Sequence, residues 1–234
     1  CLIFDRARGP DDIAAYVHSG GTTGTPKLAK IAHRGLAYKC WANTEIMAHD
    51  EDETIFADYP MFHVAGFFGR CILPFANGAR VVIPARMGAR SKRFIANYWK
   101  LVERYRISIL SGVPTTLSAL VDVPTDGADI SSLRPYAPTG SAPLPAEVAR
   151  KMEERFGVRM IATFGATEFT QNATQPPRDG DPRYGSTGLR IPYTQVKTVA
   201  LDGKGGFARE CAADEIGVIV VKGPGTIPGY VNSD

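Results

Sequence analysis

The sequence predicts an α/β fold with a largely parallel sheet, followed by a β-rich module. Short apolar runs rich in β-branched and aromatic residues alternate with segments whose apolar residues recur every three to four positions, as in βα units. A stretch rich in Pro, Gly and Asp at 175–187 ends this alternation, and the apolar runs beyond it follow one another without a helix. We therefore expect an α/β part over 1–180 and a β-rich part over 181–234.

Each expected strand is a short apolar run bounded by polar or turn-forming residues. In the α/β part these runs lie at 13–17, 28–32, 53–57, 80–83, 107–110, 135–138 and 158–163, and in the β-rich part at 194–201 and 216–222. Helical segments separate several of the earlier runs, which favours parallel neighbours joined by crossovers. The two later runs have no such helix between them.

Helical periodicity is clearest in two segments. Residues 91–105 place one apolar face on a helix with Ser91 as its N-cap, and the face consists of Phe94, Ile95, Tyr98, Leu101, Val102 and Tyr105. Residues 144–156 form a second amphipathic pattern that ends before Gly157. A further helix is expected to begin at His33.

Bulk composition excludes several classes of function. A chain of 234 residues with 44% hydrophobic and 22% charged residues is an ordinary globular sequence that can bury a large core. A net charge of +3 with scattered basic residues does not indicate nucleic-acid binding, and no apolar run approaches the roughly 18 residues of a membrane-spanning helix. The cysteines, Cys1, Cys40, Cys71 and Cys211, lie far apart without a C-x-x-C pair, so neither zinc nor disulfides are indicated. A reduced, cytoplasmic setting is expected.

The most informative segment is HSGGTTGTPK at 18–27. Its glycines allow the backbone to approach a ligand, its amides and hydroxyls can form an anion-binding concavity, and Lys27 adds a positive charge. The preceding run, DIAAYVHS at 12–19, is expected to bring the loop to the edge of a sheet. These features favour a polyphosphate ligand over the alternative of a flexible polar linker.

Three other glycine motifs do not fit this loop. The residues after Gly24 are Thr-Pro-Lys rather than Lys followed by Ser or Thr, which removes a conventional P-loop phosphotransferase. Gly20 and Gly21 are adjacent, which breaks the dinucleotide pattern G-x-G-x-x-G, and no G-x-S-x-G is present. The loop instead resembles the signature [ST]-[SG]-G-[ST]-T-G-x-P-K of the adenylate-forming superfamily, which includes acyl-CoA synthetases, luciferases and the adenylation domains of peptide synthetases.

Four further segments resemble motifs of the same superfamily, in the superfamily's order. YPMFHVAGFFG at 59–69 resembles its acyl-pocket segment, and GSAPLP at 140–145 resembles its glycine-rich segment beside the adenine. TFGATE at 163–168 resembles [YF]-G-x-T-E, and DEIGVIVVKGPGTIPGYVN at 214–232 resembles the block that precedes the ribose-binding motif. On these five segments the chain is identified as a member of the adenylate-forming superfamily.

The resemblance implies a fold and a reaction. The fold would be two helix-flanked, mostly parallel sheets joined to part of a small β-barrel-like module. The reaction would be ATP-dependent activation of a carboxylic acid to an acyl-adenylate with release of pyrophosphate, followed by transfer to CoA. Its ligands would be the acid, ATP, Mg²⁺ and CoA, and fatty acid metabolism is one expected setting. Nucleic acid is not an expected partner, and a homodimer is compatible with the resemblance.

The resemblance also assigns roles to residues. Lys27 would add charge at the β- and γ-phosphates, Thr167 would hydrogen-bond the α-phosphate, and Glu168 would bind Mg²⁺. The implied ATP-binding set is Ser19, Gly20, Gly21, Thr22, Thr23, Gly24, Thr25, Gly140, Ser141, Ala142, Thr163, Phe164 and Gly165. The implied acyl-substrate set is His63, Val64, Gly66, Val113 and Ala166.

Some of these residues also have a purely structural interpretation. Phe164 alone would be read as a core aromatic, and His63, which has phenylalanine neighbours, as a satisfied core histidine. The surrounding motifs favour a position near the adenine for Phe164 and substrate contact for His63. The run at 50–53 and the adjacent His49 are expected to form a solvated acidic turn.

Relative to the superfamily, several parts do not occur in this sequence. These are an N-terminal stretch, the motif [RY]-x-[TS]-G-D with its ribose-binding aspartate, and a C-terminal domain with its lysine. We therefore expect a fragment of the large domain that is inactive alone. No acidic anchor for an amino-acid ammonium group can be placed, which favours a simple carboxylic acid as the substrate, and an adenylation domain that loads a carrier protein stays open as an alternative. A non-catalytic nucleotide-binding homologue stays open, although Lys27, Thr167 and Glu168 are intact.

Overall fold

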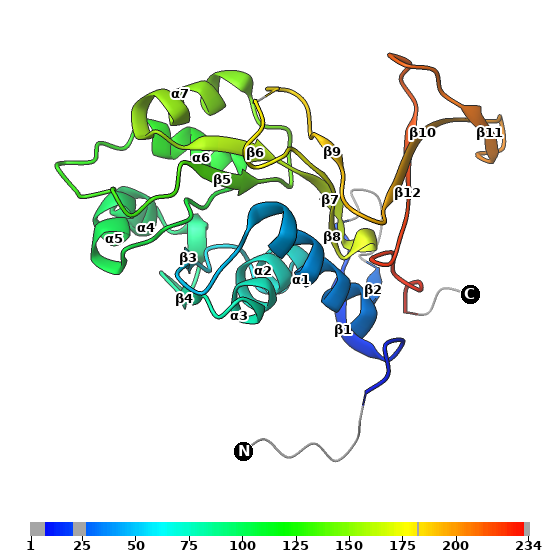
Figure 1. Ribbon diagram of the computed structural model, residues 1–234, viewed down its shortest axis with the longest axis horizontal. Helices are drawn as coiled ribbons and strands as arrows, with labels where there is room; N and C mark the ends of the chain where they lie inside the picture. Colours follow the sequence, from blue (N-terminus) through cyan, green and yellow to red (C-terminus); the bar gives the residue numbers. More distant parts are fainter. Residues whose placement is uncertain (1–7, 21–26, 182, 232–234) are drawn as a thin grey trace.

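The computed structural model describes residues 8–20, 27–181 and 183–231, and it confirms the α/β class (Figure 1). Two parallel strand pairs lie in the middle of the chain, where β3 pairs with β4 and β5 pairs with β6. Antiparallel pairs lie toward both ends. Within the described residues the strands form small separate sheets, and none of them closes into a barrel.

The described elements follow one another in this order. The first half contains β1 (Ile13–His18), β2 (Leu28–Ala32), α1 (His33–Met47), β3 (Thr54–Phe56), α2 (Val64–Phe67), the π-helical η1 (Phe68–Ile72), α3 (Leu73–Ala76), β4 (Arg80–Val82), the 3₁₀-helical η2 (Gly88–Arg90), α4 (Lys92–Ala96) and α5 (Tyr98–Tyr105). The second half contains α6 (Pro114–Val121), β5 (Tyr136–Thr139), α7 (Ala146–Phe156), β6 (Arg159–Ala162), β7 (Phe164–Ala166), the 3₁₀-helical η3 (Thr167–Phe169), β8 (Gln171–Gln175), β9 (Leu189–Arg190), β10 (Gln195–Leu201), β11 (Phe207–Glu210) and β12 (Val218–Lys222).

The largest core cluster joins the helices α4 to α7 to the parallel strands. Tyr98 and Trp99 are almost fully buried, and the Trp99 and Phe156 rings lie 4.2 Å apart. A second cluster packs the β1–β2 hairpin against the helical segment that starts at Val64, with Ile31 and Phe68 at its centre. The second cluster, through Val64 and Leu73, and a third that contains Met47, Ile55 and Ile109 border the cavity described below.

Two predicted elements differ from the structure. The run 107–110 is not a strand, and its one pairing is a bridge between Ile109 and Ile55 of β3. The predicted helix 91–105 divides at Asn97, whose side chain donates to the Arg93 carbonyl at 2.8 Å. Tyr105, on the predicted apolar face, is 39% exposed, and Trp99, which was not on that face, is 1% exposed.

Other predictions of local structure are confirmed. The Ser91 side chain accepts from the Phe94 backbone N–H at 3.3 Å, as an N-cap does. Gly157 follows α7 with φ 68°, the left-handed conformation that commonly ends a helix. Helix α1 begins at His33.

The C-terminal sheet consists of β10 between β11 and β12, all antiparallel. Figure 1 shows it as an arm that extends away from the helices, next to the β7–β9 sheet. The chain then returns, since Gly229 and Val231 bond to the backbone of β2 residues at 3.0 and 2.7 Å. Among the described residues, no helix has the length and apolar character required to cross a bilayer.

Candidate functional site

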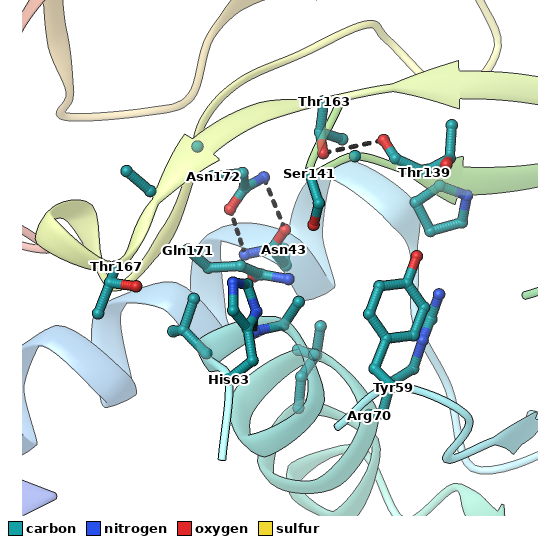
Figure 2. A pocket seen from close by; sticks show the side chains of 18 of the residues that line it. Asn43, Tyr59, His63, Arg70, Thr139, Ser141, Thr163, Thr167, Gln171 and Asn172 are labelled. Atoms are coloured by element: carbon teal, nitrogen blue, oxygen red, sulfur yellow. Dashed lines mark hydrogen bonds between the residues drawn. The ribbon is translucent and has the colours of Figure 1, made fainter. Parts of the chain in front are cut away.

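A cavity of about 540 Å³ lies where the hairpin, α1, the helical segment 64–76 and the ends of the strands meet. Figure 2 shows its wall from close by, with His63 at the start of the helical segment, Ser141 and Thr163 after β5 and β6, and Gln171 on β8. Because parallel strands share one carboxyl edge, segments from distant parts of the chain converge there.

The cavity collects most of the predicted site residues that the structure describes. They come from four of the motifs named above, which lie up to about 150 residues apart in the sequence. The predicted residues in its wall are Ser19, Gly20, Lys27, His63, Val64, Gly140, Ser141, Thr163, Gly165, Ala166, Thr167 and Glu168. Tyr230, from the fifth motif, lines the same cavity.

Other predicted site residues lie elsewhere. Gly66 is buried below the cavity, where a Cβ would lie 2.1 Å from the Pro60 carbonyl oxygen, so this position needs glycine for packing. Phe164 faces Phe169, with 6.2 Å between ring centroids, and does not line the cavity. Ala142 is exposed and Val113 precedes α6, both outside the cavity wall. Gly21, Thr22, Thr23, Gly24 and Thr25 lie outside the described residues.

The predicted phosphate loop connects two antiparallel strands. At its base the Ser19 backbone N–H donates to the Lys27 carbonyl at 2.8 Å, which continues the β1–β2 ladder. Ser19 is buried, and the Lys27 Nζ lies 5.1 Å from the centre of the Tyr230 ring. The loop therefore connects the two strands of a hairpin whose ends are held in register.

Thr167 and Glu168 lie in a tight turn between β7 and β8. The turn is possible because Gly165 lets β7 approach β8 closely, where a Cβ would lie 1.9 Å from the Gln171 carbonyl oxygen. Thr167 is buried, and the Glu168 carboxylate accepts from the Tyr230 hydroxyl at 2.7 Å. This bond raises the pKa of Tyr230 to about 12. Glu168 thus faces the same part of the cavity as Lys27.

His63 caps the helix that begins at Val64. Its Nδ1 accepts from the Ala65 backbone N–H at 3.1 Å, so in the neutral ring the hydrogen is on Nε2. Burial lowers the pKa of His63, and the nearby His18 lowers it further. The residue therefore presents a neutral N–H donor at the cavity wall (Figure 2).

A wall of side-chain amides faces His63, and sequence reasoning missed it. Asn43 on α1 and Asn172 on β8 exchange two hydrogen bonds, of 3.2 and 3.0 Å (Figure 2). The Asn172 side-chain amide also donates to the Gln175 Oε1 atom at 3.0 Å. Gln171 lines the cavity beside them. The partners are more than 120 residues apart, so no local pattern could reveal them.

The prediction of a solvated acidic turn is confirmed for Asp50, Glu51 and Asp52, which are exposed, and is wrong for Glu53. Glu53 is 3% exposed and lines the cavity, where its carboxylate contacts His49 Nδ1 at 2.8 Å and an Arg134 guanidinium nitrogen at 2.9 Å. Arg134 also binds Asp50 at 2.6 Å on the exposed side. A cation 81 residues away makes the burial of this carboxylate possible.

Comparison with known proteins gives the same family throughout. Residues 4–231 match the AMP-binding enzyme family. The marinolic acid–CoA ligase of a Pseudoalteromonas species is 33% identical over 233 residues, which are 97% of this chain and 36% of that protein.

Solved structures of related proteins contain ligands. ATP-bound MatB from Rhodopseudomonas palustris is 28% identical with a TM-score of 0.81, over 95% of this chain and 42% of that one. The anthranilate CoA ligase AuaEII in complex with anthranoyl-AMP is also 28% identical with a TM-score of 0.81, over 96% and 42%. The chain thus spans less than half the length of these relatives.

Proposed function

The chain belongs to the AMP-binding enzyme family, and from this we propose that the protein that carries it activates a carboxylic acid with ATP and transfers the acyl group to CoA. The observation that carries the proposal is the convergence of five sequence motifs on one cavity. The AuaEII complex with an acyl-adenylate supports the first step, and the CoA ligases among the relatives support the second.

In the proposed reaction a carboxylate oxygen attacks the α-phosphorus of ATP. A new P–O bond forms, the bond to the β-phosphate oxygen breaks, and pyrophosphate leaves. The CoA thiol then attacks the acyl carbon, AMP leaves, and the thiol proton passes to a base or to water. Negative charge on the phosphoryl oxygens is the main barrier in the first step, so fixed donors and cations are the tools that the site must supply.

The chain's own residues divide these tasks. Lys27 and the loop that it closes would bind the β- and γ-phosphates, and the Thr167 hydroxyl would bind the α-phosphate. Gly140 and Ser141, with Thr163, would border the adenine. His63, as a neutral N–H donor, would orient the carboxylate rather than remove a proton from it.

Glu168 fits a role in holding Mg²⁺. Its carboxylate lies in the cavity wall beside Lys27 with the Tyr230 hydroxyl as a neighbour. The described residues contain no cluster of three or more His, Cys, Asp or Glu suited to a metal, which fits an ion bound by one carboxylate, water and phosphate oxygens. When bound, Mg²⁺ would neutralise phosphate charge. Glu168 would fix its position.

Product analysis tests the proposed reaction class. The complete polypeptide that carries this chain is incubated with α-labelled ATP, a panel of aryl, short-chain and long-chain acids, and CoA. We expect acid-dependent AMP and pyrophosphate, together with a thioester of the accepted acid. Formation of ADP and phosphate instead, or ATP cleavage that no acid stimulates, would overturn the proposal.

A further inference from the structure

Arg70 is a buried cation in the wall of the cavity that the proposed phosphate chemistry does not use. It is 6% exposed and belongs to the π-helical turn that continues the helix capped by His63. Seven residues separate the two, which corresponds to about 10 Å along a helix axis. Figure 2 shows Arg70 and Thr167 on opposite sides of His63, so Arg70 lies toward the end of the cavity away from the turn that carries Glu168.

Several apolar residues line the cavity together with Arg70. Leu73 and Pro74 follow it in the cavity wall, and Ile55 and Ile109 line the same cavity from the parallel strands. A buried charge beside apolar side chains is weakly screened, so a cation there attracts an anion strongly. A substrate with a purely hydrocarbon acyl chain would offer this cation no negative charge.

Within the described residues, the contacts of Arg70 leave donors for a ligand. Its guanidinium lies over the Tyr59 ring, 4.7 Å from the ring centre, and opposes the burial that raises the pKa of the Tyr59 hydroxyl to about 12. The Asp58 carboxylate is 3.7 Å from Nε, longer than a hydrogen bond. A guanidinium has five N–H donors in one plane, more than its contacts with the Tyr59 hydroxyl and the Asp58 carboxylate occupy.

The Asp58 carboxylate also forms a hydrogen bond with a residue other than Arg70. Its Oδ1 accepts from the Ser111 hydroxyl, and its Oδ2 has no hydrogen-bond partner among the described residues. Burial raises the pKa of Asp58, which weakens it as a counter-charge for Arg70. The other carboxylate toward this end of the cavity, Glu53, is already engaged by His49 and Arg134.

We propose that Arg70, with the Tyr59 hydroxyl beside it, binds a second anionic group on the acid, so that the preferred substrates are carboxylic acids with a carboxylate or sulfonate at the far end. Figure 2 shows Tyr59 and Arg70 side by side in the cavity wall. The inference rests on the proposed acid activation and specifies its substrate class. A bidentate contact with the guanidinium would fix the tail while His63 orients the reacting carboxylate.

Matched acids test this assignment. Acid-dependent ATP–pyrophosphate exchange is measured in the complete polypeptide with succinate against butyrate, adipate against hexanoate, suberate against octanoate, and the sulfonate analogue of whichever dicarboxylate is best. At one chain length at least, the dicarboxylate should exceed the monocarboxylate in kcat/KM by tenfold or more. The preference should appear mainly in KM, because Arg70 does not touch the reacting atoms.

Variants separate recognition from folding. Arg70→Met should abolish the preference while exchange with the monocarboxylate of the same length changes less than threefold. If this variant fails to fold because it strands Asp58, the double variant Asp58→Asn/Arg70→Met removes both charges and should show the same loss. Arg93→Met, an exposed arginine on α4, is the matched control and should keep the preference.

The outcomes distinguish the two claims. The assignment of Arg70 would be overturned if monocarboxylates supported as much exchange as dicarboxylates at every length, or more, and Arg70→Met changed nothing. Acid activation would still stand. Absence of exchange with every acid would overturn the proposed function, and the assignment of Arg70 with it.

Discussion

The cavity-forming part of the chain and the C-terminal sheet differ in how far their apolar side chains are exposed. In the main core of the first region, Tyr98 and Trp99 are at most 1% exposed. In the sheet of β10 to β12, Phe207 is 66% exposed, and Ile216, just before β12, is 98% exposed. The first region is held by its core, whereas the second is held mainly by strand pairing. Side chains in the first region are therefore expected to contribute more to stability than the exposed side chains of the second.

The segment after the C-terminal sheet behaves differently from the sheet itself. Its Ile227 backbone N–H donates to the Glu168 carbonyl at 3.0 Å, and the Thr170 hydroxyl donates to the Gly225 carbonyl at 2.7 Å. Tyr230 then reaches the Glu168 carboxylate. Residues 225–231 therefore pack against the turn that carries Glu168, and Tyr230 among them lines the cavity.

The largest expected effect is on stability and contrasts one tryptophan with one isoleucine. Trp99→Ala removes a buried ring stacked on Phe156 and should cost about 3–5 kcal/mol of unfolding free energy. Ile216→Ala removes an exposed side chain and should change stability by less than about 0.5 kcal/mol. Urea unfolding of both variants measures the difference. Equal losses would show that the C-terminal sheet is packed in solution and would break the contrast.

An effect on the pH dependence of stability is expected where the two regions meet, at Lys39. This side chain is 1% exposed, donates to the Asn172 carbonyl, and lies against Gly225. Burial lowers its pKa to about 7, from an ordinary value of 10.5. Between these two values the unfolded chain binds more protons than the folded one, so stability should rise as the pH increases from about 7 to about 10.5.

Thermal unfolding across that range checks the titration. In wild type the Lys39 contribution should raise the Tm as the pH increases, and in Lys39→Met this rise should be absent. Lys151→Met, at an exposed position on α7, serves as the control and should keep it. A rise that persists unchanged in Lys39→Met would show that Lys39 is not its source.

Much of the site could be predicted from the sequence, because its motifs are local. Lys27, His63, Thr167 and Glu168 each lie in a short pattern whose order along the chain is informative, and all four line one cavity. The fold class followed equally from periodicity. Local patterns also placed the Ser91 cap correctly.

The remainder depends on contacts that no local pattern encodes. Glu53 looks like part of a solvated acidic run until Arg134 approaches it from 81 residues away. Asn43 and Asn172 are ordinary polar residues until their amides pair. Helix 91–105 has unbroken periodicity, yet the Asn97 side chain caps the Arg93 carbonyl and divides it.

The most direct test of the acid-adenylating site is pyrophosphate exchange in Glu168→Gln. The substitution keeps the shape of the side chain and removes its charge beside Lys27, so exchange with the best acid should fall by about a hundredfold, the scale of losing one electrostatic group in an active site. The matched control is Glu154→Gln on the exposed face of α7, which should retain full exchange. Undiminished exchange in Glu168→Gln, with the fold intact, would contradict the assignment of this cavity as the catalytic site.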